Sequence, residues 1–388
     1  MRLNSEGGTM NEQKKLEKFL KDNYLFRLNE INGIIEAKDI SDGPWDELME
    51  FDIFRQLKLE GFKVSMNSII YTLKSNFVKR YNAFDFYFKS LSPWTKEDPD
   101  YISLLSSHVR AVHQKRFNNH FKKWLVRTVK CALIDDYVNK NAILLVHEKQ
   151  NSGKTTFIRF LVPQSLRAYY TENLSFDKDS NIALCENIII NLDELATFSR
   201  FEINQLKSIL SKSSVKERHP FEKKAKRIPR RASFIGSTNL GEFLTDPTGN
   251  VRWIPFEIHD IDWNYCRLTD INDVWRQAYH LFLSSFPCDI TAEEIKENEE
   301  ANNEFLITTP EMELILKYYT PGTKENHDVF RTTTEIEMAL REETHNSIKI
   351  SNNQLGRALN LLKFPKDNRY KKEECVYPQK AYYINFKK

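Results

Sequence analysis

AILLVHEKQNSGKTT, at positions 142–156, is the stretch of this sequence that decides the fold. The apolar run 142–146 lies between turn-prone residues and predicts a buried strand of a parallel sheet. A helical pattern over 154–161 follows, and Pro163 ends it. A strand, a loop ending in Gly-Lys-Thr and a helix form the P-loop pattern, whose backbone N–H groups hold phosphate. We therefore expect a nucleotide site formed by Lys149, Gln150, Asn151, Ser152, Gly153, Lys154, Thr155 and Thr156.

Two residues of this loop have distinct chemical tasks. Lys154 would reach the β- and γ-phosphates of ATP, and the Thr155 hydroxyl would ligate Mg²⁺. The sequence departs from GxxxxGK[ST] at the first glycine, where it has Glu148. A side chain there constrains the turn, and its negative charge opposes phosphate. ATP and Mg²⁺ are the expected cofactors.

Two carboxylates follow a second buried strand. The apolar run 188–190 precedes Asp193 and Glu194, and Asp193 lies 39 positions after Lys154. This spacing leaves room for a helix and at least one strand between them. A buried strand ending there can present Asp193 to Mg²⁺ and Glu194 to the attacking water as general base.

Two more strands complete the expected sheet and add two site residues. The run 233–235 ends in polar residues, of which Asn239 could orient the water or contact the γ-phosphate. Arg252 comes just before the run 253–258, and such an arginine at a subunit edge can act on a neighbour's ATP. The candidate catalytic residues are thus Glu194, Asn239 and Arg252. Strands that alternate with helices indicate an α/β fold with a parallel sheet.

The regions on either side of this sheet have different patterns. Up to about residue 135 the apolar spacing is mostly helical, and the basic stretch 110–130 has its apolar residues in one stripe. After about residue 289 the chain turns acidic and helical. Helices over 333–342 and 351–362, followed by an alternating pattern over 377–386, suggest a winged helix-turn-helix. Basic residues near that wing would allow it to bind duplex DNA.

Composition bounds the class of protein. The chain has 388 residues, of which 40% are apolar, so we expect two or three domains with a substantial core. A net charge of +3 does not by itself favour nucleic acid, so local clustering of charge has to decide. No apolar run is long enough to span a bilayer, and five cysteines without a CxxC pair predict reduced thiols. We therefore expect a cytoplasmic protein without a membrane partner.

Four motifs, in their order along the chain, resemble those of the superfamily 3 helicases of the AAA+ class. Among these, the chain is most similar to the virulence-associated protein E family of phages and mobile elements. The motifs are NSGKTT at 151–156, LDEL at 192–195, STN at 237–239 with EFL at 242–244, and DPTGNVRW at 246–253. The stretch YNAFDFYF at 81–88 is also similar, so the resemblance covers about residues 30–290.

The resemblance implies a Rossmann-like P-loop AAA+ core, ATPase activity and a hexameric ring. It matches Lys154, Thr155, Asp193, Glu194, Asn239 and Arg252 to the phosphate-loop, carboxylate, sensor and arginine-finger positions. Val251 stands where the family often has another arginine. The expected domains are a helical N-terminal region (1–135), a P-loop AAA+ ATPase domain (136–290) and a C-terminal winged-helix-like α+β unit (291–388).

Charge is strongly concentrated between the second and third strands. Residues 216–231 contain eight lysines and arginines against two glutamates. Superfamily 3 proteins carry a hairpin in this interval that points into the ring channel, where lysines can neutralise phosphates of a single strand. By position, the candidates for its DNA-facing tip are His219, Lys223 and Lys224. The alternative of facing nucleotide across a subunit interface stays open for Arg218, Arg230 and Arg231.

The motifs together favour an ATP-dependent DNA helicase or translocase that serves replication of a phage or mobile element. Its partners would be single-stranded or forked DNA and copies of itself in a hexameric ring, and a primase, fused or separate, is common in such systems. Two alternatives stay open. One is an ATP-binding oligomeric scaffold or switch with weak hydrolysis, which Glu148 favours and the Asp193–Glu194 pair opposes. The other is a DNA-binding regulator with a vestigial P-loop.

Overall fold

The protein divides into two compact units. A computed structural model describes residues 6–41, 43–172, 174, 179–195, 198–217, 226–239, 241, 243–244, 250–306, 308–369 and 378–387. The first unit comprises Met1–Thr238 and Phe256–Ile290, and the second comprises Asn239–Pro255 and Thr291–Lys388. Across the described ranges, no helix has both the length and the apolar character needed to cross a bilayer.

The first unit is built around a six-stranded sheet with the order β5-β12-β6-β11-β8-β7. Its strands are β5 (Val109–Ala111), β12 (Trp253–Ile261), β6 (Ala142–Val146), β11 (Ser233–Thr238), β8 (Ile189–Leu192) and β7 (Tyr170–Glu172). β11 pairs in parallel with β6 and β8, and β7 pairs in parallel with β8. β5 pairs antiparallel with β12 at one edge. The fold is therefore α/β with a largely parallel sheet, as the apolar runs predicted.

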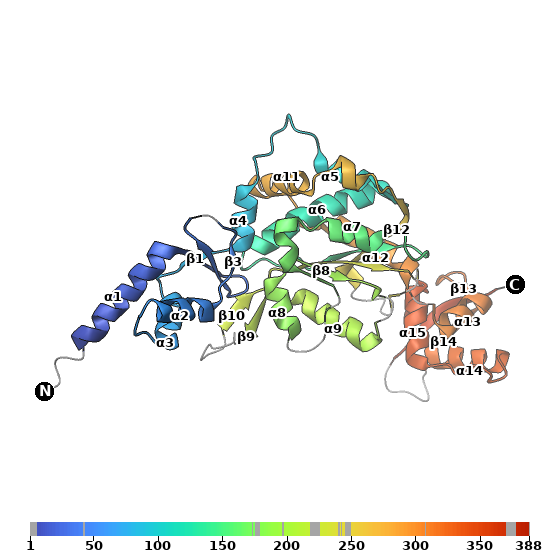
Figure 1. Cartoon of the computed structure of the whole chain (residues 1–388). Coiled ribbons are helices and arrows are strands. Elements are labelled where there is room, and N and C mark those ends of the chain that lie inside the picture. The colour runs from blue at the N-terminus through green and yellow to red at the C-terminus, as the bar shows by residue number, and fades with distance from the viewer. Residues whose placement is uncertain are drawn as a thin grey trace. The chain divides into compact units, whose positions relative to one another are not determined.

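Helices cover both faces of this sheet, which explains why its central strands are continuous apolar runs. Every residue of β6, β8 and β11 is buried. Figure 1 shows α6 (Gln114–Leu133) and α7 (Lys154–Phe160) on one side and α8 (Asp179–Glu186) and α9 (Arg200–Ser211) on the other. The basic helix α6 turns its apolar stripe to the sheet, and the Trp124 indole N–H donates to the Phe234 carbonyl at 2.9 Å. The predicted packing of this helix is confirmed.

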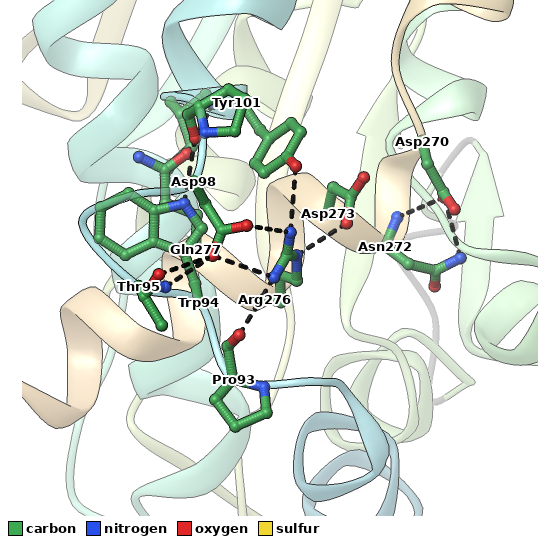
Figure 2. Close-up of polar contacts among 12 residues, drawn as sticks. Pro93, Trp94, Thr95, Asp98, Tyr101, Asp270, Asn272, Asp273, Arg276 and Gln277 are labelled. Carbon is green, nitrogen blue, oxygen red and sulfur yellow. Dashed lines mark hydrogen bonds and ion pairs between the residues drawn. The ribbon is translucent and has the colours of Figure 1, made fainter.

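A polar cluster fixes the segment before α5 (Tyr101–Ser107) to α11 (Ile271–Leu283), both in the first unit. Arg276, at the centre of Figure 2, donates to Asp98 at 3.0 Å and to Asp273 at 2.7 Å. Its guanidinium also donates to the Tyr101 hydroxyl at 3.0 Å and to the Pro93 carbonyl at 3.1 Å. Four residues thus accept hydrogen bonds from one arginine. These bonds hold the connection from α4 (Ala83–Ser90) to α5 in place against α11.

The N-terminal part of the first unit contains a sheet that helical spacing did not predict. Its order is β3-β2-β1-β4, where β1 and β2 pair antiparallel and β1 and β4 pair in parallel. The strands are β1 (Tyr24–Asn29), β2 (Ile35–Asp39), β3 (Asp46–Glu47) and β4 (Lys79–Tyr81). The helices are α1 (Glu6–Asn23), α2 (Glu50–Leu59) and α3 (Met66–Leu73). Apolar residues of all three helices and of β2 share one buried cluster, so this region is α/β and not helical alone.

The basic segment of the first unit is flanked by two short strands. β9 (Ser214–Glu217) and β10 (Lys226–Pro229) pair antiparallel, with Glu217 opposite Lys226. The described part of this unit also contains a short 3-10 helix (Gln164–Tyr169) and α10 (Tyr265–Leu268). The paired strands form a hairpin base in the interval where the family resemblance places a hairpin.

The second unit combines helices with a small antiparallel sheet. The helices are α12 (Ala292–Asn302), α13 (Pro310–Tyr318), α14 (Thr333–Glu343) and α15 (Asn352–Leu361), with 3-10 turns at Asn250–Arg252 and Asn303–Phe305. β16 (Gln379–Phe386) pairs antiparallel with β13 (Tyr319–Pro321), β14 (Val329–Thr332) and β15 (Lys366–Arg369). Residues of α13, α14, α15 and β16 share one apolar cluster. Both predicted helices and the predicted terminal strand are confirmed.

Candidate functional site

The loop between β6 and α7 encloses the ammonium group of Lys154. Its Nζ donates to the His147 carbonyl at 3.1 Å, to the Lys149 carbonyl at 3.3 Å and to the Ser152 hydroxyl at 2.9 Å. Three donors on one ammonium thus meet three oxygens of the same loop. Burial lowers the pKa of Lys154, and the nearby Asp193 carboxylate acts in the opposite direction. The lysine is held inside the loop, where a phosphate oxygen could replace any of these acceptors.

The backbone of this loop is left-handed at two positions. Asn151 has φ of +57° and Gly153 has φ of +85°. Asparagine and glycine are the residue types that adopt this conformation at least cost. Glu148 is not among the described residues with positive φ. The replacement of the first glycine by Glu148 therefore imposes no left-handed strain, and the Glu148 side chain is exposed.

His147 fixes the start of the loop. Its Nδ1 accepts from the Lys149 backbone N–H at 2.9 Å, which leaves Nε2 as the donor to the His259 carbonyl at 2.9 Å. One neutral ring with a defined tautomer therefore joins the loop to β12. His147 was not among the predicted site residues, although its position directly after the buried strand marked it as part of the loop.

Thr155 and Asp193 meet across the end of the sheet. The Thr155 Oγ1 donates to Asp193 Oδ1 at 3.0 Å, and the Ser237 hydroxyl donates to the same oxygen. β6, β8 and β11 are adjacent parallel strands, so their carboxyl ends bring these three side chains together. Hydroxyl and carboxylate oxygens are the ligands that Mg²⁺ prefers, so this donor set fits the expected metal. Thr155 and Asp193 were the two predicted metal ligands, whereas Ser237 was not among the predicted site residues.

Glu194 occupies a turn directly after β8 and is exposed. Its φ is +50°, which is a costly conformation for a residue with a long side chain. Backbone outliers of this kind cluster at functional sites, because the surrounding structure has to hold them in place. Glu194 is one of six described non-glycine residues with positive φ, and with Asn151 it is one of the two that lie at the predicted nucleotide site.

The other candidate residues lie on the loop or beside it, in the second unit, or outside the described residues. Gln150 and Thr156 are exposed on the loop and on the first turn of α7. Asn239 follows β11 directly, and both it and Arg252 belong to the second unit. The three residues proposed for the hairpin tip lie outside the described residues, namely His219, Lys223 and Lys224.

Arg230 is not a surface residue that could face a neighbouring subunit. It is fully buried, and its guanidinium donates to the carbonyls of Leu210 at 2.7 Å, Asn139 at 2.9 Å and Ala232 at 2.9 Å. Burial lowers its pKa. The nucleotide-facing alternative for Arg230 is therefore wrong, because all these donors point to backbone oxygens inside its own unit. Arg231 forms an ion pair with Asp135 at 2.5 Å.

Comparisons with known proteins agree with this geometry. The virulence-associated protein E-like domain matches residues 89–307, a range that includes the loop and both carboxylates but not the stretch 81–88. The apo structure of the NrS-1 C-terminal region is similar, with a TM-score of 0.52 and 13% identity over 96% of this chain and 99% of that chain. Its A form gives 0.48 and 11% identity over 95% and 98%.

Two further comparisons add little. JCV helicase, solved with a bound thiazolopyridine compound, gives a TM-score of 0.28 at 14% identity over 60% of this chain and 70% of that chain. No curated protein matches the sequence. At these identities the NrS-1 likeness shows a shared fold and no more. The domain match, however, covers more than half of the chain, and the protein therefore belongs to the virulence-associated protein E-like family.

Proposed function

We propose that this chain is an ATP-dependent DNA helicase or translocase of the superfamily 3 type, acting in replication of a phage or mobile element. The observation that carries the proposal is the hydrogen bond between Thr155 and Asp193, 3.0 Å long and 38 positions apart in sequence. It brings the end of the phosphate-loop motif to the first of the two carboxylates. Family membership supports the same reading.

The residues of this site have separate tasks in ATP hydrolysis. Lys154 would exchange its loop oxygens for phosphate oxygens, and the loop N–H groups would bind the remaining phosphate charge. Thr155 and Asp193 would hold Mg²⁺, directly or through water, with Ser237 keeping the carboxylate in orientation. Bound Mg²⁺ neutralises charge on the phosphates. These residues bind and orient, and Glu194 would take the proton of the attacking water.

Two catalytic assignments depend on the second unit. Asn239 would orient the attacking water, and Arg252 would act on ATP in a neighbouring subunit of a hexameric ring. Both assignments rest on motif positions in the sequence. A ring supplies the neighbour that an arginine finger requires, so oligomerisation and hydrolysis would be coupled.

DNA contact is proposed at the β9–β10 hairpin. The strands pair antiparallel up to Glu217 and Lys226, and in sequence the candidates His219, Lys223 and Lys224 lie between them. Basic residues at such a position would neutralise phosphates of a single strand. Six hairpins in a ring would make this contact repeatedly along the strand.

A second contact, with duplex DNA, is proposed in the winged-helix-like second unit. The exposed side of α15 carries Asn353, Arg357 and Asn360, and Lys363 follows the helix. No residue of α15 is acidic. Amide and guanidinium groups on one helix face are the groups that bind base edges and phosphates in a groove. Loss of forked-DNA affinity in Arg357→Ala, with single-strand affinity retained, would support this assignment.

The test of the main proposal compares ATP turnover with and without single-stranded DNA. Wild type, Lys154→Ala and Glu194→Gln are measured together with Glu257→Gln, a control at an exposed glutamate of β12. Stimulated turnover and forked-DNA unwinding that both vanish in the first two variants and persist in the control would support the motor. ATP-dependent assembly without turnover would instead indicate a scaffold, and DNA binding indifferent to ATP would indicate a regulator.

A further inference from the structure

Trp263 lies directly against the phosphate loop. It follows β12 in the first unit and is 53% exposed. A Cβ added to Gly153 would lie 2.8 Å from Trp263 Cζ2 and 3.2 Å from Cη2. The edge of the six-membered ring therefore occupies the space next to the one loop residue that has no side chain. No motif of the family resemblance includes this tryptophan.

Buried neighbours fix the position of this ring. Trp263 stacks on Tyr265 with centroids 6.4 Å apart and an interplanar angle of 24°. Tyr265 is fully buried and contacts Phe157 at 5.3 Å and Phe160 at 4.9 Å, both on α7. The residues next to Trp263 in sequence are also held, since the Asp262 carboxylate accepts from the Asn264 N–H at 3.0 Å and contacts His108 Nδ1 at 3.1 Å. The indole is thus held relative to the helix that follows the loop.

We propose that Trp263 stacks against the base of a nucleotide bound at this loop. The inference rests on the proposed nucleotide site and adds the part of it that holds the nucleoside. A base is joined to the phosphates through one ribose, so it lies within about one sugar of the phosphate chain that the loop holds. A rigid, half-exposed indole there offers the face and the apolar area that base stacking uses. Stacking senses ring area and not hydrogen-bonding edges, so ADP and GDP should bind alike and CDP more weakly.

The experiment separates base from phosphate. Calorimetric affinities for ADP, GDP, CDP and tripolyphosphate are measured with Mg²⁺ on the full chain as wild type, Trp263→Ala, Trp263→Phe and Lys154→Ala. Leu268→Ala is the control, since Leu268 is 71% exposed on the neighbouring helix α10. If the base stacks on the indole, Trp263→Ala should weaken the affinity for ADP about tenfold, and Trp263→Phe should retain most of that affinity. Tripolyphosphate should bind Trp263→Ala as tightly as wild type, and Leu268→Ala should match wild type throughout.

Two results would overturn this inference while leaving the nucleotide site intact. Unchanged ADP affinity in Trp263→Ala would show that the base lies elsewhere. Equal weakening of ADP and tripolyphosphate would show that the indole only supports the loop. Failure of the proposed function looks different, because wild type would then bind neither ligand and Lys154→Ala would change nothing. The Phe variant keeps an aromatic ring, so it guards against a loss caused by misfolding.

Discussion

Replacing Gly153 with alanine tests the geometry of the loop and of Trp263 together. Two costs follow from the structure. The backbone has φ of +85°, which an L-residue adopts at a cost of about 1–2 kcal/mol. The new Cβ would also lie 2.8 Å from Trp263 Cζ2, whereas carbon atoms in contact are about 3.5–4.0 Å apart. The ring therefore has to move by about 0.7 Å or more.

The cost of moving the ring can be bounded. A fully buried tryptophan side chain buries roughly 200 Å². Trp263 is 53% exposed, so it buries about half of that area, and all of this half would be lost if the ring moved fully into solvent. At about 25 cal/mol per Å² this is at most about 2.5 kcal/mol. We expect Gly153→Ala to cost about 2–4 kcal/mol in the wild type. In a Trp263→Ala background only the backbone cost of about 1–2 kcal/mol should remain.

Thermal unfolding of the four proteins in this double-mutant cycle measures the difference. For a unit of this size, about 1 kcal/mol shifts the melting midpoint by roughly 2–4 °C. Gly153→Ala should therefore lower the midpoint by at least a further 2 °C or so when Trp263 is present. Equal shifts in both backgrounds would mean that the two residues do not touch, and the reasoning would fail.

Three further predictions concern the same unit. Thr155→Val keeps the shape of the side chain but removes the hydroxyl that donates to Asp193. We expect kcat for ATP hydrolysis to fall by about 10²-fold or more, with an unchanged melting midpoint. Retained turnover would exclude the metal role of Thr155. Arg230→Met leaves several buried carbonyls without a donor, so it should lower the free energy of unfolding by about 3 kcal/mol or more. Arg227→Met, at an exposed position, should change it by no more than about 0.5 kcal/mol. Similar shifts of the melting midpoint for both variants would show that Arg230 is not buried. Burial raises the pKa of Glu186 to about 7, so its contribution to stability is complete below the unfolded-state value and is lost as pH rises towards 7. Glu186→Gln should therefore melt higher than wild type at pH 8, and this advantage should shrink as pH falls and disappear below about 4.5.

The central sheet could be predicted because its strands are buried on both faces. Strands of that kind have to be continuous apolar runs, and 142–146, 188–190 and 233–235 each lie in or beside an observed strand. β6 and β8 both pair in parallel with β11, so their carboxyl ends lie at the same edge of the sheet and bring Thr155 and Asp193 together. The stripe of α6 was visible for a different reason: the helix packs its apolar residues against the sheet.

The N-terminal sheet and the contact of Trp263 could not be predicted in the same way. β1 and β2 are short, and their polar residues alternate irregularly with apolar ones. Their pairing depends on α1, α2 and α3 covering one face, which is a tertiary effect that no local pattern records. Trp263 reaches Gly153 because β12 lies beside β6 in the sheet. That neighbour relation joins segments more than 100 positions apart, so spacing alone gave no sign of it.

The burial of Arg230 has a mechanical consequence for the hairpin. Arg230 comes directly after β10, and its guanidinium is bonded to carbonyls at the end of α9, just before β6 and just before β11. The base of the hairpin is thereby bonded to the amino ends of β6 and β11, whose carboxyl ends lie at Thr155, Asp193 and Ser237. One arginine side chain therefore connects the base of the hairpin to α9 and to two strands of the central sheet, so this base cannot move without breaking those hydrogen bonds.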